Sequence, residues 1–365
     1  MFFVHFWYMN NRLPFYSYIL LFLVLPVCFR NSSSTAKSEV PDTTSSFRLF
    51  EDETPLEITL QFDLSTYLKT KSRKEYMKGR ITFHPDNADT ITKNINIRAR
   101  GIFRNEWCYY GPMELNFKKA DFGYFDLNSI KKIKLVPQCT AGSESEKNIL
   151  VEYLIYKMFN VMTDTSFRVR LLKINYVDSE NKKKPFTQFG FFLEPVKMLS
   201  DRTNSIEIES SALNQKSIFP RVMDRIAIFN YMIGNYDWAV PNQHNIKVFK
   251  PLVFDISNLA AAVPYDFDFT GLVNAGYAIP EDKVTGTTNI RERIFLGVCR
   301  TREEYQKDLV EFVEKKDDFY RIINEFPHLN AKQKKDLIMY LDEFFNQCTG
   351  KQSIINVFLN NCKNF

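Results

Sequence analysis

The spacing of the apolar residues changes along this chain, and that change limits the folds it can adopt. Apolar and polar residues alternate in residues 56–64 and 95–100, which is the period of a half-buried strand. After the Glu194-Pro195 pair, the apolar residues follow helical spacing instead, as in residues 218–233. The sequence therefore predicts a strand-rich first half followed by a mostly helical second half.

One helix interrupts the predicted strands of the first half. Residues 144–162 have apolar side chains at helical spacing, and Ser143 is a suitable N-cap. Residues 49–195 are expected to form an antiparallel sheet with this helix inserted. The other strands expected in this β-rich lobe are 113–117, 130–136 and a hairpin formed by 167–176 and 186–193.

The second half, residues 196–365, is expected to form a mostly helical lobe with one short β-hairpin. Its elements are predicted as the helix 218–233, the strands 245–249 and 260–266, and the helices 302–315, 316–325 and 331–346. The fold class is then α+β, with a hinge near residues 194–196. Two lobes of this kind give the outline of a two-lobed protein-kinase-like fold.

The N-terminal residues have the pattern of an export signal. Residues 13–28 form an apolar run that is short for a membrane span, and polar residues follow it. Residues 1–29 are predicted to be a signal peptide or a membrane anchor, with lipidation at Cys28 as a further alternative. Residues 30–48, rich in Ser and Thr, are expected to be a disordered tether. The protein is therefore expected to be exported to the periplasm or cell envelope, with membrane contact only through this segment.

The composition argues against a nucleic-acid partner. The chain of 365 residues has a net charge of +5, and its lysines are scattered instead of forming a basic stripe with interleaved aromatic residues.

None of the six cysteines belongs to a C-x-x-C pair, so a zinc knuckle is not expected. In an exported protein a disulfide between Cys108 and Cys139 is plausible, as is a second between Cys299 and either Cys348 or Cys362. Isolated buried thiols remain the alternative.

Asp237 lies in a loop after the helix 218–233, with asparagines five and eight residues later at Asn242 and Asn245. We favour Asn245, because a strand follows it directly. In phosphoryl transfer an aspartate near the acceptor hydroxyl acts as catalytic base, and an asparagine oxygen helps to bind magnesium. The alternative is that these residues only cap a loop through Asx turns.

Asp266 and Asp268 are two residues apart, so on a strand they point to the same face. Apolar residues precede them, and buried neighbouring carboxylates are costly unless a cation neutralises them. We therefore predict that both bind metal. Alternatively, one of them caps the turn toward Gly271, or the pair does acid/base work in a hydrolase.

Lys134 lies on a predicted strand between Ile133 and Leu135, and Glu152 lies on the helix that follows. A strand lysine paired with a helix glutamate can hold the phosphates of a nucleotide. Lys132 competes for this role, and a solvated strand face is the alternative for either lysine. The turn at Arg100 and Gly101 could cover the phosphates, with arginine replacing backbone amides as the phosphate donor.

These motifs resemble those of the spore-coat CotH-type atypical kinases over residues 95–275, at a distance. A closer resemblance, over nearly the whole chain, is to uncharacterised exported bacterial proteins. The latter share the motifs Arg-Ala-Arg-Gly-x-Phe-Arg, Asn-x-Asp-Trp and Tyr-Asp-Phe-Asp-x-x-Gly-x-Val-Asn, found here at 98–104, 235–238 and 265–274. The CotH resemblance implies a kinase that uses ATP and a divalent metal to phosphorylate exported proteins. This chain departs from the CotH pattern, with Ile102-Phe103 in place of Asn-Ser.

The expected function is thus transfer of the ATP γ-phosphate, with Mg²⁺ or Mn²⁺, to a hydroxyl-bearing acceptor that is a protein or a glycan. Two alternatives remain open. One is a kinase-fold binding or scaffold protein without transfer activity, and the other is a carboxylate-dependent hydrolase of glycans or phosphoesters.

Overall fold

The computed structural model describes residues 48–364, apart from 87–88, 254–257, 281–285 and 350–352. The predicted signal or anchor (1–29) and nearly all of the predicted tether (30–48) lie outside this range. Within the described residues, no helix is both long enough and apolar enough to cross a membrane.

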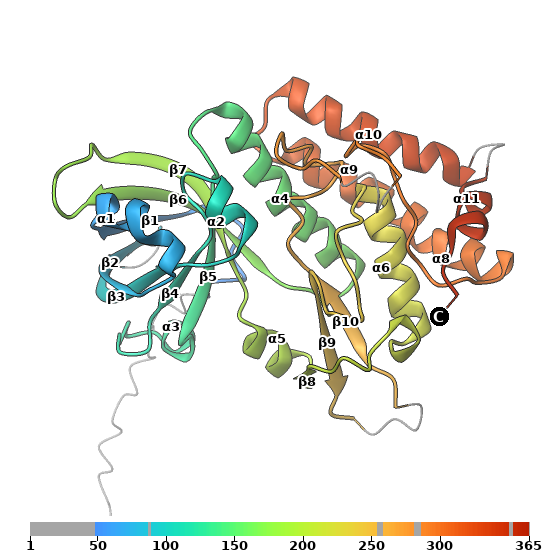
Figure 1. The fold of residues 1–365 in the computed structure, drawn as a ribbon, viewed down its shortest axis with the longest axis horizontal. Coiled ribbons are helices and arrows are strands. Elements are labelled where there is room, and N and C mark those ends of the chain that lie inside the picture. Colours follow the sequence, from blue (N-terminus) through green and yellow to red (C-terminus); the bar gives the residue numbers. More distant parts are fainter. Residues whose placement is uncertain (1–47, 87–88, 254–257, 281–285, 350–352, 365) are drawn as a thin grey trace, which may run out of the picture. The chain divides into compact units, whose positions relative to one another are not determined.

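Seven strands of the first half close into a barrel (Figure 1). Around the barrel the order is β1-β2-β3-β4-β5-β7-β6, and every neighbouring pair is antiparallel except β1 and β6, which pair in parallel. The strands are β1 (Leu56–Phe62), β2 (Met77–His84), β3 (Ile91–Ala99), β4 (Met113–Asn116), β5 (Lys132–Pro137), β6 (Val169–Asp178) and β7 (Phe186–Leu193).

The prediction of a two-lobed protein-kinase-like fold is wrong, because the sheet is a closed barrel and not an open lobe. Closure comes from the parallel pairing of β1 with β6, which runs from Leu56 opposite Leu172 to Phe62 opposite Asp178. The alternating residues of β1 are buried inside the barrel, in a core of their own. Alternation requires only that one face of a strand be buried, so it fits an open sheet and a barrel equally well.

The long helix α4 (Ser143–Met162) packs outside the barrel against β6 and β7 and, on its other side, against α9 (Lys316–Glu325). Figure 1 shows α4 between the barrel strands and the C-terminal helices. The apolar side chains on the two faces of β6 therefore belong to two different hydrophobic cores. Leu172 and Ile174 belong to the barrel interior, whereas Val169 and Leu171 belong to the core around α4.

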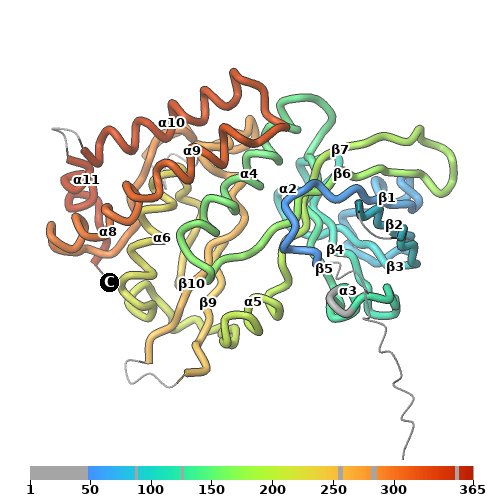
Figure 2. Tube along the Cα trace, turned by 180° about the vertical axis from the view of Figure 1, so that it is seen from behind, coloured from blue at the N-terminus to red at the C-terminus, as the bar shows by residue number. Residues whose placement is uncertain are grey.

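The second half contains the predicted helices and the predicted hairpin, and Figure 2 shows them from behind. Strands β8 (Ser205–Ile208), β9 (Ile246–Pro251) and β10 (Ala261–Pro264) form a sheet in the order β10-β9-β8. The helices are α5 (Val196–Arg202), α6 (Pro220–Ile233), α8 (Arg302–Glu314), α9, α10 (Ala331–Thr349) and α11 (Ile354–Asn361). Strands β2 and β8 and helices α5 and α11 were not expected from the sequence.

Short helical turns complete the described chain. They are α1 (Leu64–Thr70), η1 (Lys71–Arg73), α2 (Phe103–Trp107), α3 (Phe125–Ser129) and η2 (Gln215–Ser217). The described residues belong to one compact unit, in which α4 from the first half shares a core with the second half. The division expected near residue 195 stays a prediction.

Two disulfides join segments that are distant in the sequence. The predicted bond between Cys108 and Cys139 is confirmed, and Cys299 pairs with Cys362. Cys348, the other partner that the sequence left open for Cys299, is a free thiol. Burial raises the pKa of Cys348 to about 12, so this thiol is held in its unreactive protonated form.

Candidate functional site

The hairpin of β9 and β10 brings Asn245 and Asp266 to the same end of the small sheet. Ile246, the first residue of β9, lies opposite Pro264, the last of β10, and the backbone N–H of Tyr265 donates to the carbonyl of Asn245 at 3.0 Å. Asn245 and Asp266 both adopt left-handed backbone conformations, with φ of 51° and 65°. Asparagine and aspartate adopt this conformation more readily than other non-glycine residues, because their short polar side chains can bond to the local backbone.

A close contact between two glycines places Asp237 beside this end of the sheet. Helix α6 ends at Gly234, which has φ of 68°, and the N–H of Gly271 donates to the carbonyl of Gly234 at 3.0 Å. A Cβ atom on Gly234 would lie 3.2 Å from the backbone of Gly271 and would collide with the hydroxyl of Tyr340. The loops that carry Asp237 and Asp268 are thus held together by backbone contacts that only glycine permits.

We expect Gly234→Ala to lower the free energy of unfolding by at least about 1–2 kcal/mol, the usual cost of a left-handed conformation for a residue with a Cβ atom. The measurement is urea unfolding followed by circular dichroism. Gly276→Ala is the matched control, because nothing lies within 4 Å of a Cβ built there. Equal stability of the two variants would contradict this account of the Gly234 contact.

Asp237, His244 and Asn245 form a hydrogen-bonded group. The Nε2 atom of His244 lies 2.7 Å from Oδ1 of Asp237, and the amide nitrogen of Asn245 donates to Oδ2 of Asp237 at 2.9 Å. The same nitrogen donates to the backbone carbonyl of Asp237 at 2.8 Å. These bonds fix the Asp237 carboxylate at a partly exposed position and leave the amide oxygen of Asn245 as the group that could bind a cation.

Three carboxylates meet beside this group. Glu152, on α4, and Asp266 and Asp268, after β10, have oxygen atoms that all lie within 4.8 Å of one another. Glu152 and Asp268 are buried, and Asp266 is partly exposed. The sequence predicted metal binding for the two aspartates, whereas it assigned Glu152 to the phosphates.

The predicted pairing of Lys134 with Glu152 is wrong, because Arg104 occupies that place. Nη1 of Arg104 donates to Oε2 of Glu152 at 2.9 Å, and its Nε lies 3.7 Å from Oδ2 of Asp268. The same guanidinium donates to the carbonyl of Pro137 at 3.3 Å. Arg104 is buried on α2, so a fixed positive charge compensates two of the three carboxylates.

Burial raises the pKa of both buried carboxyl groups, because the charged form loses its hydration. The charge of Arg104 opposes this rise at both residues. The negative charges of Asp266 and, to a smaller extent, Asp237 add to the rise of the pKa at Asp268. The hydroxyl of Tyr277 donates to Oδ2 of Asp268 at 2.9 Å.

Lys134 points outward from the barrel, toward the residues that follow β10. Its neighbours Ile133 and Leu135 are buried in the barrel interior, and its amine lies 5.2 Å from the centre of the Tyr265 ring. The pKa of Lys134 is lowered to about 8, mainly by burial and also by the positive charge of Arg100, while the negative charge of Asp266 opposes the shift. The Lys134 amine thus lies against Tyr265, the residue before Asp266, and the charges of Arg100 and Asp266 both act on it.

Lys132, the competing candidate, is exposed. Its amine lies 3.5 Å from the carboxylate of Glu114, so it forms an ion pair on the barrel surface. Gly101 lies in the turn after Arg100 and has φ of 79°, with nothing within 4 Å of a Cβ built there. This turn is open around Gly101 and begins where the N–H of Arg100 donates to the carbonyl of Pro112 at 2.8 Å.

The carboxylate cluster has the free oxygen atoms that a hard divalent cation requires. Oε1 of Glu152 is buried without a hydrogen-bond partner. Within the part of the chain that the structure describes, the Asp266 carboxylate forms no hydrogen bond or ion pair, although the backbone N–H of Asp266 donates to the Tyr156 hydroxyl at 2.8 Å. These residues fit Mg²⁺ or Mn²⁺.

Sequence reasoning missed three residues of this site: His244, Arg104 as the partner of Glu152, and Tyr277. His244 stands next to Asn245 in the printed sequence and could have been found by that adjacency. Arg104 follows the turn at Arg100 and Gly101 by three residues, and nothing in the local sequence pattern links it to α4. Tyr277 gives no signal, because aromatic residues are common throughout the chain.

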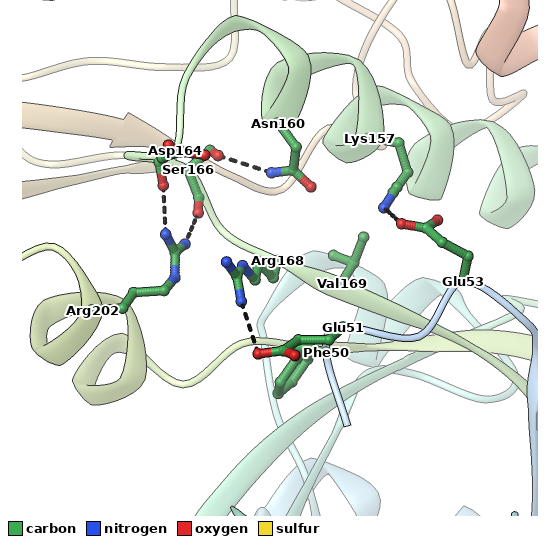
Figure 3. Close-up of a pocket in the computed structure, with 10 residues that line it drawn as sticks. All are labelled: Phe50, Glu51, Glu53, Lys157, Asn160, Asp164, Ser166, Arg168, Val169 and Arg202. Carbon is green, nitrogen blue, oxygen red and sulfur yellow. Dashed lines mark hydrogen bonds and ion pairs between the residues drawn. The ribbon is translucent and has the colours of Figure 1, made fainter. Parts of the chain in front are cut away.

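A cavity of 270 Å³, shown in Figure 3, lies beside α4 and next to residues 50–53. Its cations are already paired: Lys157 lies 2.6 Å from Glu53, and Arg168 lies 3.9 Å from Glu51. Arg202 donates to the carbonyls of Asp164 and Ser166. None of the residues predicted to act on phosphates lines this cavity.

No family model matches this sequence, and no curated protein is significantly similar to it.

Proposed function

We propose that this protein is a metal-dependent phosphotransferase that moves the γ-phosphate of ATP to a hydroxyl group of a protein or glycan, with Mg²⁺ or Mn²⁺. The observation that carries the proposal is the position of Asp266. Its carboxylate lies among the oxygens of Glu152 and Asp268, and its charge acts on the amine of Lys134. Phosphoryl transfer needs such a cation site next to a positive group that can hold phosphates.

The residues divide into three roles under this proposal. Asp266 and Asp268, with the amide oxygen of Asn245, would hold the cation, which when bound neutralises charge on the phosphates. Lys134 and Arg100 would bind phosphate oxygens, Arg100 through its planar guanidinium.

Asp237 would act as the base. The acceptor oxygen attacks the γ-phosphorus, the bond from that phosphorus to the β–γ bridging oxygen breaks, and ADP leaves. The Asp237 carboxylate takes the proton of the acceptor hydroxyl. His244 holds that carboxylate through its 2.7 Å contact and so orients it toward the acceptor.

A specific observation favours a second candidate, a binding protein without transfer activity. Arg104 already compensates Glu152 and Asp268, so two of the three carboxylates have a counter-charge without a metal ion. A cluster neutralised in this way can be a purely structural feature.

We also propose that the protein is exported to an oxidising compartment such as the periplasm or cell envelope. Two disulfides within the described residues support this, because such bonds persist outside reducing cytoplasm.

Thermal unfolding with nucleotide and metal tests the phosphotransferase. We expect Mg²⁺-ATP at 100 times its dissociation constant to stabilise the wild-type protein by about 2.7 kcal/mol. Asp266→Asn should abolish the metal-dependent part of that shift, because it removes a charged ligand. Asp336→Asn, at an exposed aspartate on α10, is the control that should leave it intact.

Transfer itself is measured as release of ADP and labelling of a generic hydroxyl-rich protein with γ-labelled ATP. If neither Mg²⁺ nor Mn²⁺ increases the thermal stabilisation of the wild-type protein by ATP, the phosphotransferase proposal is contradicted and the binding protein is favoured.

A further inference from the structure

The outer face of strands β2, β3 and β4 contains a groove of 580 Å³ that shares no residue with the candidate site. Helix α4 covers a different part of the barrel, formed by β6 and β7 (Figure 1). The polar residues that line the groove are three lysines and three asparagines, namely Lys78, Lys118, Lys119, Asn94, Asn96 and Asn116. None of the lining residues, all of which the structure describes, is acidic.

Strand register places polar side chains of four neighbouring strands in one row. Lys78 of β2 lies opposite Asn96 of β3, which lies opposite Asn116 of β4. Asn116 in turn lies opposite Lys132 of β5. Neighbouring strands are about 4.8 Å apart, so the row extends for about 14 Å across the sheet. Lysines that are scattered in the sequence are thus gathered on one face by strand pairing, with a lysine at each end of the row.

The positive charge of this face is not balanced. Four exposed cations form no ion pair with any residue that the structure describes: Lys78, Arg80, Lys118 and Lys119. On the outward positions of β2 to β5, all of them described, Glu114 is the only carboxylate. It is already paired with Arg98 at 2.8 Å and Lys132 at 3.5 Å. The face therefore attracts an anionic partner.

The amide side chains between the lysines can be reached from solvent. Asn94 is exposed, Asn96 and Asn116 are partly exposed, and the amide nitrogen and oxygen of Asn96 are both accessible. Among the described residues, neither Asn94 nor Asn96 uses its side chain in a hydrogen bond, whereas Oδ1 of Asn116 accepts from the N–H of Lys118 at 3.0 Å. Each amide offers both donors and an acceptor, which suits a partner that carries hydroxyl groups.

The face lacks the side chains that a membrane or a single-stranded nucleic acid would use. No exposed large apolar residue lies on the outward positions of β2 to β5, which the structure describes completely. Tyr76, just before β2, has its ring beneath Arg98 at 4.7 Å and near Lys132 at 5.7 Å. Interfacial membrane binding buries apolar side chains, and single-stranded nucleic acids stack on free aromatic rings. A hydroxyl-rich polyanion requires neither.

We propose that this face binds an acidic polysaccharide, a linear sugar chain with carboxylate groups. The carboxylates pair with Lys78, Lys118 and Lys119, and the hydroxyl groups between them form hydrogen bonds with Asn94 and Asn96. Such a chain fits because it alternates negative charge with neutral hydroxyl groups, as the face alternates lysine with asparagine. This binding goes beyond the proposed phosphotransfer and does not depend on it.

Calorimetric titration of the full chain, after removal of metal with EDTA, tests this surface. The probes are octagalacturonate and a hyaluronan octasaccharide, with neutral malto-octaose for comparison. We expect both acidic probes to bind, malto-octaose to give no binding, and affinity to fall as salt screens the charges. The double variant Lys78→Gln/Lys118→Gln should weaken binding of the acidic probes about tenfold. Asn96→Ala should weaken it about threefold without changing its salt dependence, because a neutral hydrogen bond is lost.

Lys307→Gln/Lys335→Gln is the matched control, because it removes the same charge from exposed lysines on α8 and α10. It should bind the acidic probes like the wild-type protein, and circular dichroism checks that every variant keeps its fold. The proposal is overturned if neither acidic probe binds, if the control loses as much affinity as Lys78→Gln/Lys118→Gln, or if Asn96→Ala has no effect.

Competition distinguishes the other polyanions. Duplex DNA or phosphatidylglycerol vesicles that bind more tightly than both acidic probes, at the same concentration of charge, would also overturn the proposal. Asp266→Asn should leave the titration unchanged, so failure of this test and failure of the phosphotransferase test can be told apart.

Discussion

Replacing Arg104 with methionine is expected to lower the free energy of unfolding by about 3–5 kcal/mol, because it leaves a buried charge without its partner. Glu152 is 1% exposed and receives its hydrogen bond from Arg104 at 2.9 Å, and Asp268 is 3.7 Å from the same guanidinium. Urea unfolding near neutral pH, followed by circular dichroism, measures the effect.

A second variant separates lost charge compensation from lost packing. Adding Glu152→Gln to Arg104→Met removes the uncompensated carboxylate, so the double variant should recover a large part of the lost stability. Arg321→Met is the control, because Arg321 pairs with Asp318 on the surface, where such pairs contribute about 0–1 kcal/mol. If Arg104→Met cost no more than Arg321→Met, the structural role assigned to Arg104 would be wrong.

The second large effect is expected from the disulfides. Replacing both Cys299 and Cys362 with serine should lower the free energy of unfolding by about 4 kcal/mol, since the bond closes a long loop and limits the unfolded chain. The bond between Cys108 and Cys139 closes a shorter loop, with a separation of 31 residues against 63, so its loss should cost slightly less in the same entropy model.

Urea unfolding of the two double-serine variants measures these costs, with Cys348→Ser as the control for the free thiol. Loss of the Cys108 bond has a further consequence, because Cys108 ends the short helix that carries Arg104. We expect it to weaken the interaction between Arg104 and Glu152, which a double-mutant cycle with Arg104→Met would detect as non-additivity. Disulfide variants as stable as Cys348→Ser would contradict this account.

Some of the residues that meet at the candidate site could be predicted to lie close together from the sequence, and others could not. Asn245 and Asp266 flank the two strands of a hairpin whose apolar pattern is visible in the sequence, so their proximity follows from antiparallel pairing. The outward direction of Lys134 follows from the burial of Ile133 and Leu135 in the same way. The partner of Glu152 could not be predicted from the sequence, because Arg104 and Glu152 are 48 residues apart and meet only through tertiary packing.

The amino-acid sequence determined the local structure of this protein. Apolar spacing indicated the helices α4, α6, α8, α9 and α10, the β6–β7 and β9–β10 hairpins and several other strands, and cysteine usage indicated the bond from Cys108 to Cys139. These features depend on residues close in the chain or on a small number of possible pairings.

Tertiary structure alone decided that the first sheet closes and that Arg104 compensates the acidic cluster. Closure requires β1 to pair in parallel with β6, more than a hundred residues later, and the alternation of β1 is the same with or without that partner. Side-chain periodicity records which face of a strand is buried but not what buries it. The choice of partner depends on the packing of the whole barrel, which no local pattern contains.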